Sequence, residues 1–222
     1  MTLRDIAFWI RSARADKALE RMRATATPGQ AFDQLYAASP DPFGAELPQF
    51  RYQRRKYKAL LSMLPKQPYE AVLDVGCGIG VFSRALAPHA GQVLGIDVSS
   101  HAIARARSIS GDHANLRFEE GDVTSLGGGG ARYNLIVLAD VIYYLEPLTD
   151  AVVTSLAADL VALLAPGGLL LLVNHFFFGI DRPSRTTRHI HNLFRASPRL
   201  VPLAEHRRAF YLSTILRSSG EQ

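Results

Sequence analysis

Short apolar runs separated by amphipathic stretches make up most of the chain from residue 69 onward. Nearly continuous apolar runs are typical of strands that are buried on both faces of a sheet. Strands are predicted at residues 71–75, 92–97, 116–120, 133–139 and 169–174. Helical spacing of the intervening apolar residues predicts helices at residues 80–87, 100–108 and 148–164. This alternation indicates a doubly wound α/β fold, with a mainly parallel sheet covered by helices on both faces.

The C-terminal part of the chain breaks this alternation. After a predicted helix at residues 184–196, two strand-like runs at residues 200–205 and 209–216 are separated by a very short connection. Such a connection joins antiparallel neighbours, because parallel strands need a longer crossover. We therefore predict a seven-stranded sheet with an antiparallel last strand. The glycine run at residues 127–130 is predicted to be a surface turn.

The first part of the chain predicts helical additions to this sheet. Apolar side chains in residues 3–24 lie at helical spacing, residues 37–48 are a Pro- and Gly-rich connector, and residues 50–64 predict a further helix. The predicted domains are an amphipathic helical extension (1–30), a lid or cap segment (31–68) and the main α/β domain (69–222). The first helix either packs on the domain or meets a membrane surface or a partner.

Composition and charge narrow the class of protein. Hydrophobic residues make up 48% of the chain and charged residues 20%, as in ordinary globular domains. The formal net charge of +5 lies largely near the two ends of the chain, so nucleic acid is not the expected partner. The single cysteine, Cys77, rules out an internal disulfide, and no metal site is expected. No secretory signal or membrane-spanning run is recognisable, so we expect a cytoplasmic protein.

Three glycines at alternate positions, Gly76, Gly78 and Gly80, follow the first predicted strand and precede a helix. Glycine lets the backbone approach a nucleotide-like ligand closely, and a helix N-terminus offers unpaired amide donors. A dinucleotide fingerprint would need Gly or Ala at position 81, where the chain has Val81. Asp74, just before the turn, would repel a pyrophosphate and attract a cationic ligand. A nicotinamide-dependent oxidoreductase is therefore disfavoured.

Two further acids follow the next two predicted strands, Asp97 and Asp122. A carboxylate at the first position can accept hydrogen bonds from ribose hydroxyls, and one at the second can accept the amino group of adenine. Because the carboxyl ends of parallel strands meet at one edge of a sheet, Asp74, Asp97 and Asp122 are expected to outline one crevice. The alternative is that each acid caps a helix or a loop.

Residues 69–172 resemble the class I methyltransferases that depend on S-adenosylmethionine (SAM). The matching motifs are Leu73-Asp74-Val75-Gly76-Cys77-Gly78-Ile79-Gly80, Gly95-Ile96-Asp97, Glu120-Gly121-Asp122-Val123 and Leu164-Ala165-Pro166-Gly167-Gly168. The resemblance implies a Rossmann-like fold, SAM as the cofactor and S-adenosylhomocysteine (SAH) as the product. The implied cofactor-binding residues are Tyr52, Lys56, Asp74, Gly76, Cys77, Gly78, Asp97, Val98, Asp122, Val123, Ala139, Asp140 and Tyr143.

A closer resemblance, to the NodS-type nodulation methyltransferases, is carried by residues 138–146. Residues 41–43 and 52–57 also resemble the N-terminal helix that covers the cofactor in that group. The resemblance implies that Tyr52 and Lys56, one helical turn apart, close over the methionine end and that Lys56 pairs with the cofactor carboxylate. Arg54 or Arg55 in place of Lys56, or a simply solvated basic face, are the alternatives. NodS-type enzymes methylate the free amine of a glucosamine at the end of a chitooligosaccharide, which implies an aminosugar or a similar small molecule as acceptor.

Candidate catalytic residues follow the fourth and fifth predicted strands: Asp140, Tyr143 and Tyr144, and then His175. An amine must be neutral when it attacks a methyl donor, so a nearby carboxylate, phenol or imidazole would take its proton. We expect Asp140 or Tyr144 to contact the acceptor or the methionine moiety, and His175 is the candidate base. The alternatives are a backbone hydrogen bond for His175 and simple packing for the tyrosines. The aromatic turn at residues 176–178 is either an acceptor wall or buried.

Other classes of function fit the same cofactor site. An O-methyltransferase of a small natural product and a non-catalytic SAM-binding protein are the alternatives that remain open. Residues 139–142 do not form the clamp that holds a flipped base, so methylation of nucleic acid is disfavoured. The sequence does not predict an oligomeric state.

Overall fold

The computed structural model describes residues 3–125 and 132–219, so the predicted turn at residues 127–130 lies outside the described chain. A seven-stranded sheet of order β3-β2-β1-β4-β5-β7-β6 forms its centre. The strands are β1 (Tyr69–Val75), β2 (Ala90–Asp97), β3 (Leu116–Glu120), β4 (Tyr133–Ala139), β5 (Leu164–Phe176), β6 (Leu200–Arg208) and β7 (Phe210–Ser218).

Strand directions confirm the predicted doubly wound fold. β1 runs parallel to β2 and β4, and the parallel pairing continues outward to β3 and β5. The last strand, β7, is antiparallel to both β5 and β6 and lies between them. β5 begins earlier than predicted, at Leu164, because this residue pairs with Tyr133 before a shift in register.

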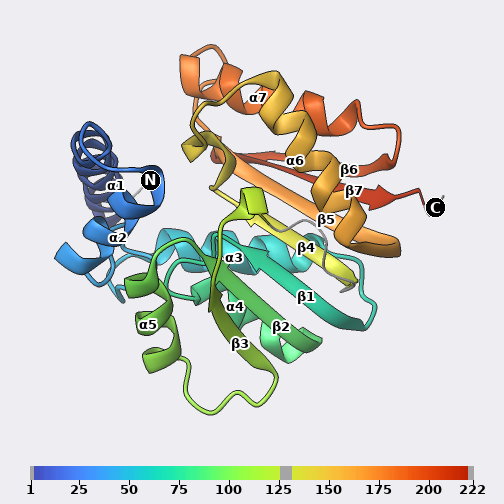
Figure 1. Ribbon diagram of the computed structural model, residues 1–222, viewed down its shortest axis with the longest axis horizontal. Coiled ribbons are helices and arrows are strands. Elements are labelled where there is room, and N and C mark those ends of the chain that lie inside the picture. The colour runs from blue at the N-terminus through green and yellow to red at the C-terminus, as the bar shows by residue number, and fades with distance from the viewer. Residues whose placement is uncertain (1–2, 126–131, 220–222) are drawn as a thin grey trace.

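Helices cover both faces of the sheet (Figure 1). α3 (Arg51–Met63) and α4 (Val81–Leu86) pack on one face, α6 (Asp150–Leu163) and α7 (Arg182–Arg195) pack on the other, and α5 (Ser100–Ile109) lies beside β2 and β3. Along β4, Leu135 and Val137 face the α3 side while Ile136 and Leu138 face the α6 side, as the two-residue period of a strand requires. The helix predicted as a lid therefore belongs in part to the sandwich, since Leu60 of α3 is completely buried in its core.

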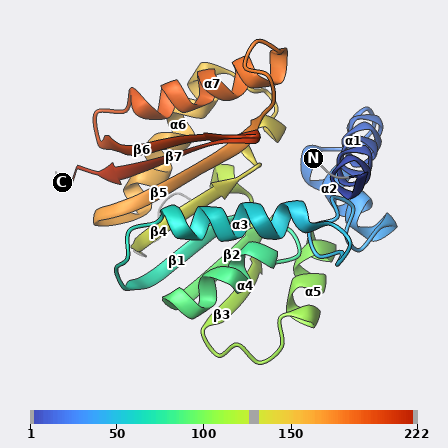
Figure 2. The same ribbon diagram turned by 180° about the vertical axis from the view of Figure 1, so that it is seen from behind.

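Two helices, α1 (Leu3–Arg23) and α2 (Pro28–Ala38), stand apart from these layers at one end of the sheet (Figures 1 and 2). α2 lies mostly between the helix predicted at residues 3–24 and the connector predicted at residues 37–48, where the sequence analysis predicts no element. In the structure Thr27 begins α2: its side chain accepts from Gln30 N, and the Gln30 side chain accepts from Thr27 N. α1 packs on α2 through Leu19 and neighbouring apolar residues. None of the described helices is both long enough and apolar enough to cross a membrane.

Candidate functional site

A cavity of about 830 Å³ lies where α1, α2 and α3 approach the carboxyl ends of the parallel strands. Open α/β sheets bind their ligands at this edge, and the volume suits a small-molecule site. With the exceptions of Asp74 and Gly80, the predicted site residues line this cavity. They are Tyr52, Lys56, Gly76, Cys77, Gly78, Asp97, Val98, Asp122, Val123, Ala139, Asp140, Tyr143, Tyr144 and His175.

The turn after β1 presents its backbone to the cavity. Gly76 and Gly78 have φ angles of 67° and 54°, a left-handed conformation that favours glycine. A Cβ on Gly76 would lie 2.3 Å from Val141 Cγ2, and one on Gly78 would lie 2.8 Å from the Tyr36 hydroxyl. Side chains are excluded at both positions, so a ligand meets backbone here. Burial raises the pKa of the intervening Cys77 thiol, which is therefore neutral and packs against the core under α5.

Asp97 is 8% exposed and lies next to this turn. Its two carboxylate oxygens accept hydrogen bonds from Gly78 N at 2.8 Å and from Ser99 N at 3.0 Å. Burial raises the pKa of Asp97 to about 6. A carboxylate oxygen can accept more than one hydrogen bond, so the fixed group keeps capacity for a pair of hydroxyl donors such as those of a ribose.

Asp122 serves as a cap and also lines the cavity. Its Oδ1 accepts hydrogen bonds from both the backbone N–H and the hydroxyl of Thr124, each at 2.8 Å. Val123 beside it is 8% exposed and belongs to the core under α6. The two interpretations from sequence, a ligand-binding carboxylate and a cap of the loop, are therefore compatible for Asp122.

Asp74 is not among the residues that line the cavity, and its carboxylate faces α4 instead of the crevice that the sequence predicts. It is 2% exposed, and its Oδ2 accepts a hydrogen bond from the hydroxyl of Ser83 in α4 at 2.6 Å. Burial raises the pKa of Asp74 to about 7. An acid before a glycine turn can face the ligand or the following helix, and here it fixes α4 to β1.

An ion pair lies deep in the cavity, between Lys56 of α3 and Asp140 directly after β4. Lys56 is 4% exposed and its ammonium contacts Asp140 Oδ2, so this side chain does not lie on a solvated basic face. Its predicted pairing with the cofactor carboxylate stays a prediction. Asp140 has a φ of 61° and donates its N–H to Val173 O at 2.8 Å. Its other oxygen, Oδ1, is buried and has no hydrogen-bond partner within the described chain.

Three rings connect this ion pair with α1. The Tyr143 ring centroid lies 4.1 Å from that of His175 and 4.4 Å from that of Tyr144. The Tyr144 hydroxyl donates to Asp16 Oδ1 at 2.7 Å. Burial lowers the pKa of His175 below its ordinary value, although the nearby Asp140 and Asp16 act in the opposite direction. His175 is therefore neutral at pH 7, and both tyrosines line the cavity as well as pack.

Sequence reasoning missed the residues that α1 adds to the cavity. Trp9, Ser12 and Asp16 have spacings of three and four residues, which places them on one face of the helix, and all three line the cavity. Apolar periodicity could not single out this face because two of its members are polar. The Trp9 ring lies 5.0 Å from Tyr52, and the others of what we call the aromatic wall, Phe177 and Phe210, lie 5.3 Å and 5.1 Å from Trp9.

The predicted aromatic turn after β5 is divided between core and surface. Phe176 is 3% exposed and belongs to the interior, Phe177 joins the aromatic wall, and Phe178 is 77% exposed. Both interpretations of this turn therefore apply, each to a different residue.

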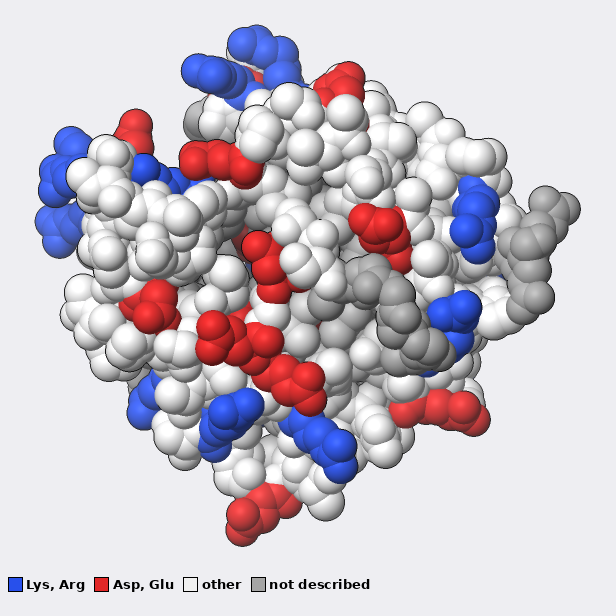
Figure 3. Space-filling view, viewed as in Figure 1, with Lys and Arg blue, Asp and Glu red and all other residues white. Residues whose placement is uncertain are grey.

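The cavity is acidic although the chain as a whole is basic. Among the described residues that line it, one carries an ammonium group, Lys56, and six carry carboxylates. These six are Asp16, Asp41, Asp97, Asp122, Asp140 and Glu146. Figure 3 shows acidic side chains around a hollow near the middle of one face, while most Lys and Arg side chains lie toward its edges. Such a field attracts cations and repels phosphates.

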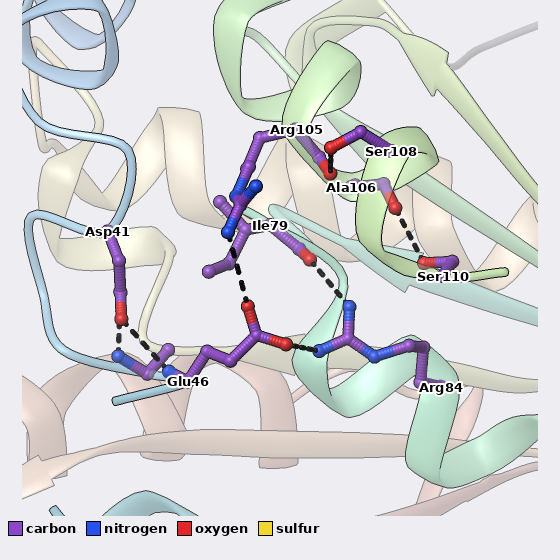
Figure 4. A network of polar contacts seen from close by, with 9 residues as sticks. Asp41, Glu46, Ile79, Arg84, Arg105, Ala106, Ser108 and Ser110 are labelled. Atoms are coloured by element: carbon purple, nitrogen blue, oxygen red, sulfur yellow. Dashed lines mark hydrogen bonds and ion pairs between the residues drawn. The ribbon is translucent and has the colours of Figure 1, made fainter. Parts of the chain in front are cut away.

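A polar network fixes the connector between α2 and α3 to the sheet domain (Figure 4). Glu46 lies between Arg84 of α4, at 2.7 Å, and Arg105 of α5, at 3.9 Å. The Asp41 carboxylate accepts hydrogen bonds from Ala45 N at 2.8 Å and Glu46 N at 3.0 Å. Because Asp41 and Ala45 also line the cavity, this network holds that part of its wall in place.

The residues present fit an adenosyl donor with a positive charge. A backbone wall at Gly76 and Gly78 admits close approach, and Asp97 offers oriented acceptor lone pairs. The surplus of carboxylates matches a ligand that carries a sulfonium and an ammonium group. Among the described residues no group of three or more His, Cys, Asp or Glu side chains could hold a metal ion.

Comparison with known proteins agrees with this geometry. Residues 72–168 match the family model described as a methyltransferase domain. Nodulation protein S from Sinorhizobium fredii is 33% identical over 155 residues, which cover 69% of this chain and 67% of that protein. The protein of the same name from Rhizobium tropici is 32% identical over 154 residues, 69% of this chain but 60% of that relative, so the chain spans less than two thirds of its length.

A solved structure shares the fold over most of the chain. The N-methyltransferase NodS from Bradyrhizobium japonicum WM9, crystallised with SAH, aligns with a TM-score of 0.71 at 23% identity. The alignment covers 87% of this chain and 99% of that one. The carboxylate-lined cavity at the end of the sheet thus belongs to a fold that is known to hold SAH in another protein.

Proposed function

Because this chain belongs to the NodS-like class I SAM-dependent methyltransferases, we propose that it transfers the methyl group of SAM to a small-molecule amine, that of an aminosugar or a short oligosaccharide. The charge of the cavity is the observation that carries this proposal. Of the described residues that line the cavity, six carry carboxylates and one carries an ammonium, which is paired with Asp140. An amine acceptor suits such a site, whereas a phosphate or carboxylate acceptor would lack a cationic partner.

SAM supplies an activated methyl group on a positively charged sulfur, so no covalent enzyme intermediate is needed. The protein then has to orient donor and acceptor and exclude water. We assign the adenosyl end to Gly76, Gly78 and Asp97, with Asp122 and Val123 at the adenine. Ala139, Asp140 and Tyr143 line the same cavity, and we place the acceptor between them and the residues of α1 that line it.

Proton removal falls to His175 in this proposal. Its ring is neutral at pH 7, lines the cavity and is held by contact with the rings of Tyr143, at 4.1 Å, and Phe177, at 5.4 Å. The unpartnered Oδ1 of Asp140 supplies a buried acceptor for the N–H groups of the same amine. Tyr144 is held by Asp16 and serves to position the acceptor.

The pH dependence of kcat tests the assignment of His175. A base must be unprotonated, so kcat should rise with pH and its acidic limb should lie below the ordinary histidine pKa of about 6.5. The His175→Gln variant should lose about a hundredfold in kcat, within the range for general-base removal, and should lose this limb. If His175→Gln kept both the wild-type kcat and the acidic limb of its pH profile, another group would be the general base.

An acceptor panel tests the proposed function itself. Release of SAH would be followed with a free-amine glucosamine dimer, its fully N-acetylated counterpart, a phenol and a malonate ester as acceptors. We expect turnover with the free amine and none with the N-acetylated dimer, because acylation removes the nucleophilic lone pair. Preferential methylation of the phenol or the carboxylate would show an O-methyltransferase instead.

We also propose that the three predicted segments of the chain form one functional unit. The extension (1–30), the cap segment (31–68) and the catalytic domain (69–222) would act together, because the cavity takes walls from all three.

A further inference from the structure

We propose that Asp16, on α1, is the counter-ion that recognises the ammonium group of the acceptor and so selects amines over neutral and phosphorylated acceptors. This inference rests on the proposed function, and it assigns acceptor specificity to the first helix of the chain. Asp16 makes no described hydrogen bond to the glycine turn or to Asp97, the two parts of the site that we assign to the adenosyl end.

The position of Asp16 meets the geometric requirement. Asp16 is an exposed residue that lines the cavity, and one oxygen of its carboxylate is oriented by the Tyr144 hydroxyl at 2.7 Å. Desolvation by the surrounding cavity wall raises the pKa of this carboxyl above its ordinary value. Tyr144 in turn lies against Tyr143, whose ring contacts His175. Asp16, Asp140 and His175 line the same cavity, and the two carboxylates, one on α1 and one directly after β4, both act to raise the pKa of His175.

Among the described residues, no Lys or Arg side chain neutralises the charge of Asp16. Lys56, the cation of the cavity lining, is buried against Asp140, and Arg23 farther along α1 pairs with Glu146 and with Tyr144 O. Within the described residues, Asp16 has no ion pair with a Lys or Arg. A carboxylate that is oriented but has no cationic partner is suited to bind an ammonium group of the ligand.

The walls beside Asp16 suit a polyhydroxylated ring. Three buried polar atoms in the cavity lining have no hydrogen-bond partner within the described chain: Trp9 Nε1, Gln53 Oε1 and Asp140 Oδ1. Trp9 Nε1 is a donor and Gln53 Oε1 is an acceptor, a pair that hydroxyl groups can satisfy, while Asp140 Oδ1 is the acceptor assigned above to the amine. The aromatic wall offers ring faces for the apolar face of a sugar and for a cation. These atoms therefore independently indicate a ligand that combines hydroxyl groups with an amine.

The test compares Asp16→Asn with Glu20→Gln, which removes the same charge from the same helix outside this cavity. With a free-amine glucosamine dimer, Asp16→Asn should raise KM about tenfold, as for one hydrogen bond to a charged group, and should leave SAM affinity unchanged. Asp16→Glu, which keeps the charge, should recover part of the loss. Glu20→Gln should behave like the wild-type protein, and phosphoethanolamine should be a poor acceptor throughout.

Binding of the same dimer to the SAH-loaded protein, measured by calorimetry, separates this inference from the proposed function. If the dimer binds and Asp16→Asn weakens it, the inference stands even when no methyl group is transferred. If the dimer is methylated and Asp16→Asn changes neither its affinity nor its KM, the inference is overturned while the proposed function survives. Absence of both binding and methylation in the wild-type protein overturns both.

Tyr144→Phe distinguishes a direct role of Asp16 from an indirect one. This variant removes the hydrogen bond but keeps the carboxylate, so the dimer should lose less affinity than in Asp16→Asn. Equal losses in the two variants would mean that Asp16 acts by positioning Tyr144, which would overturn the proposed counter-ion role.

Discussion

Replacing Asp97 with Ala should lower the affinity for SAM at least about a hundredfold. The Asp97 carboxylate is fixed by Gly78 N and Ser99 N and presents its remaining lone pairs to the cavity. Each hydrogen bond to a charged group contributes about 1.5–3 kcal/mol, so the loss of two costs about 3 kcal/mol, and 1.4 kcal/mol corresponds to tenfold. Calorimetric titration with SAM measures the change.

Two controls accompany this measurement. Asp97→Asn retains the shape and should give a smaller loss of affinity, while Asp112→Asn, on an exposed turn outside the cavity, should give none. Because burial raises the pKa of Asp97 to about 6, the wild-type affinity should fall as the pH is lowered from 7 to 5, since protonation removes the charged acceptor. If Asp97→Ala bound SAM as tightly as the wild-type protein does, Asp97 would not be part of the cofactor site.

Replacing Asp140 with Asn should reduce both stability and activity. The change leaves the Lys56 ammonium, 4% exposed, without its counter-charge, and breaking a buried ion pair in this way costs about 3 kcal/mol or more in the free energy of unfolding. Asn is among the residues that tolerate the left-handed backbone of position 140, so the effect reports the charge rather than the conformation. Denaturant unfolding gives the stability, and SAH release gives kcat/KM, which should fall about a hundredfold.

The double variant Lys56→Met, Asp140→Asn separates the two effects. Removal of both charges should restore most of the stability, because an apolar side chain of similar length replaces the buried ammonium. Activity should not return, since the Asp140 oxygens that face the cavity are changed in both variants. Recovery of activity together with stability would show that Asp140 serves only to hold Lys56.

The parts of the fold that depend on local periodicity were predictable from sequence. The positions of the strands followed from the apolar runs, and their directions followed from the lengths of the connections between them. The reversed direction of β7 followed from its short hairpin with β6. The glycine turn and Asp97 were predictable for the same reason: the chemistry of a strand-to-helix turn is written in adjacent residues.

Side-chain direction and tertiary partners were less accessible. Asp74 turns toward Ser83 of α4 rather than the cavity, and no local pattern distinguishes the two directions. Lys56 meets Asp140 across 84 positions of the chain, and a pairing over that separation leaves no trace in local spacing. Asp16 reaches the cavity because α1 docks beside the sheet, whereas α2 could have been found from its capping box at Thr27 and Gln30.

The position of the transferred methyl group tests the central claim most directly. The wild-type protein would be incubated with methyl-deuterated SAM and a free-amine glucosamine dimer, and the label would be located in the product by mass spectrometry and NMR. An acidic cavity that presents an amine to the donor predicts label on nitrogen. Label on a hydroxyl oxygen, or an unlabelled dimer under conditions in which SAM binds, would contradict it.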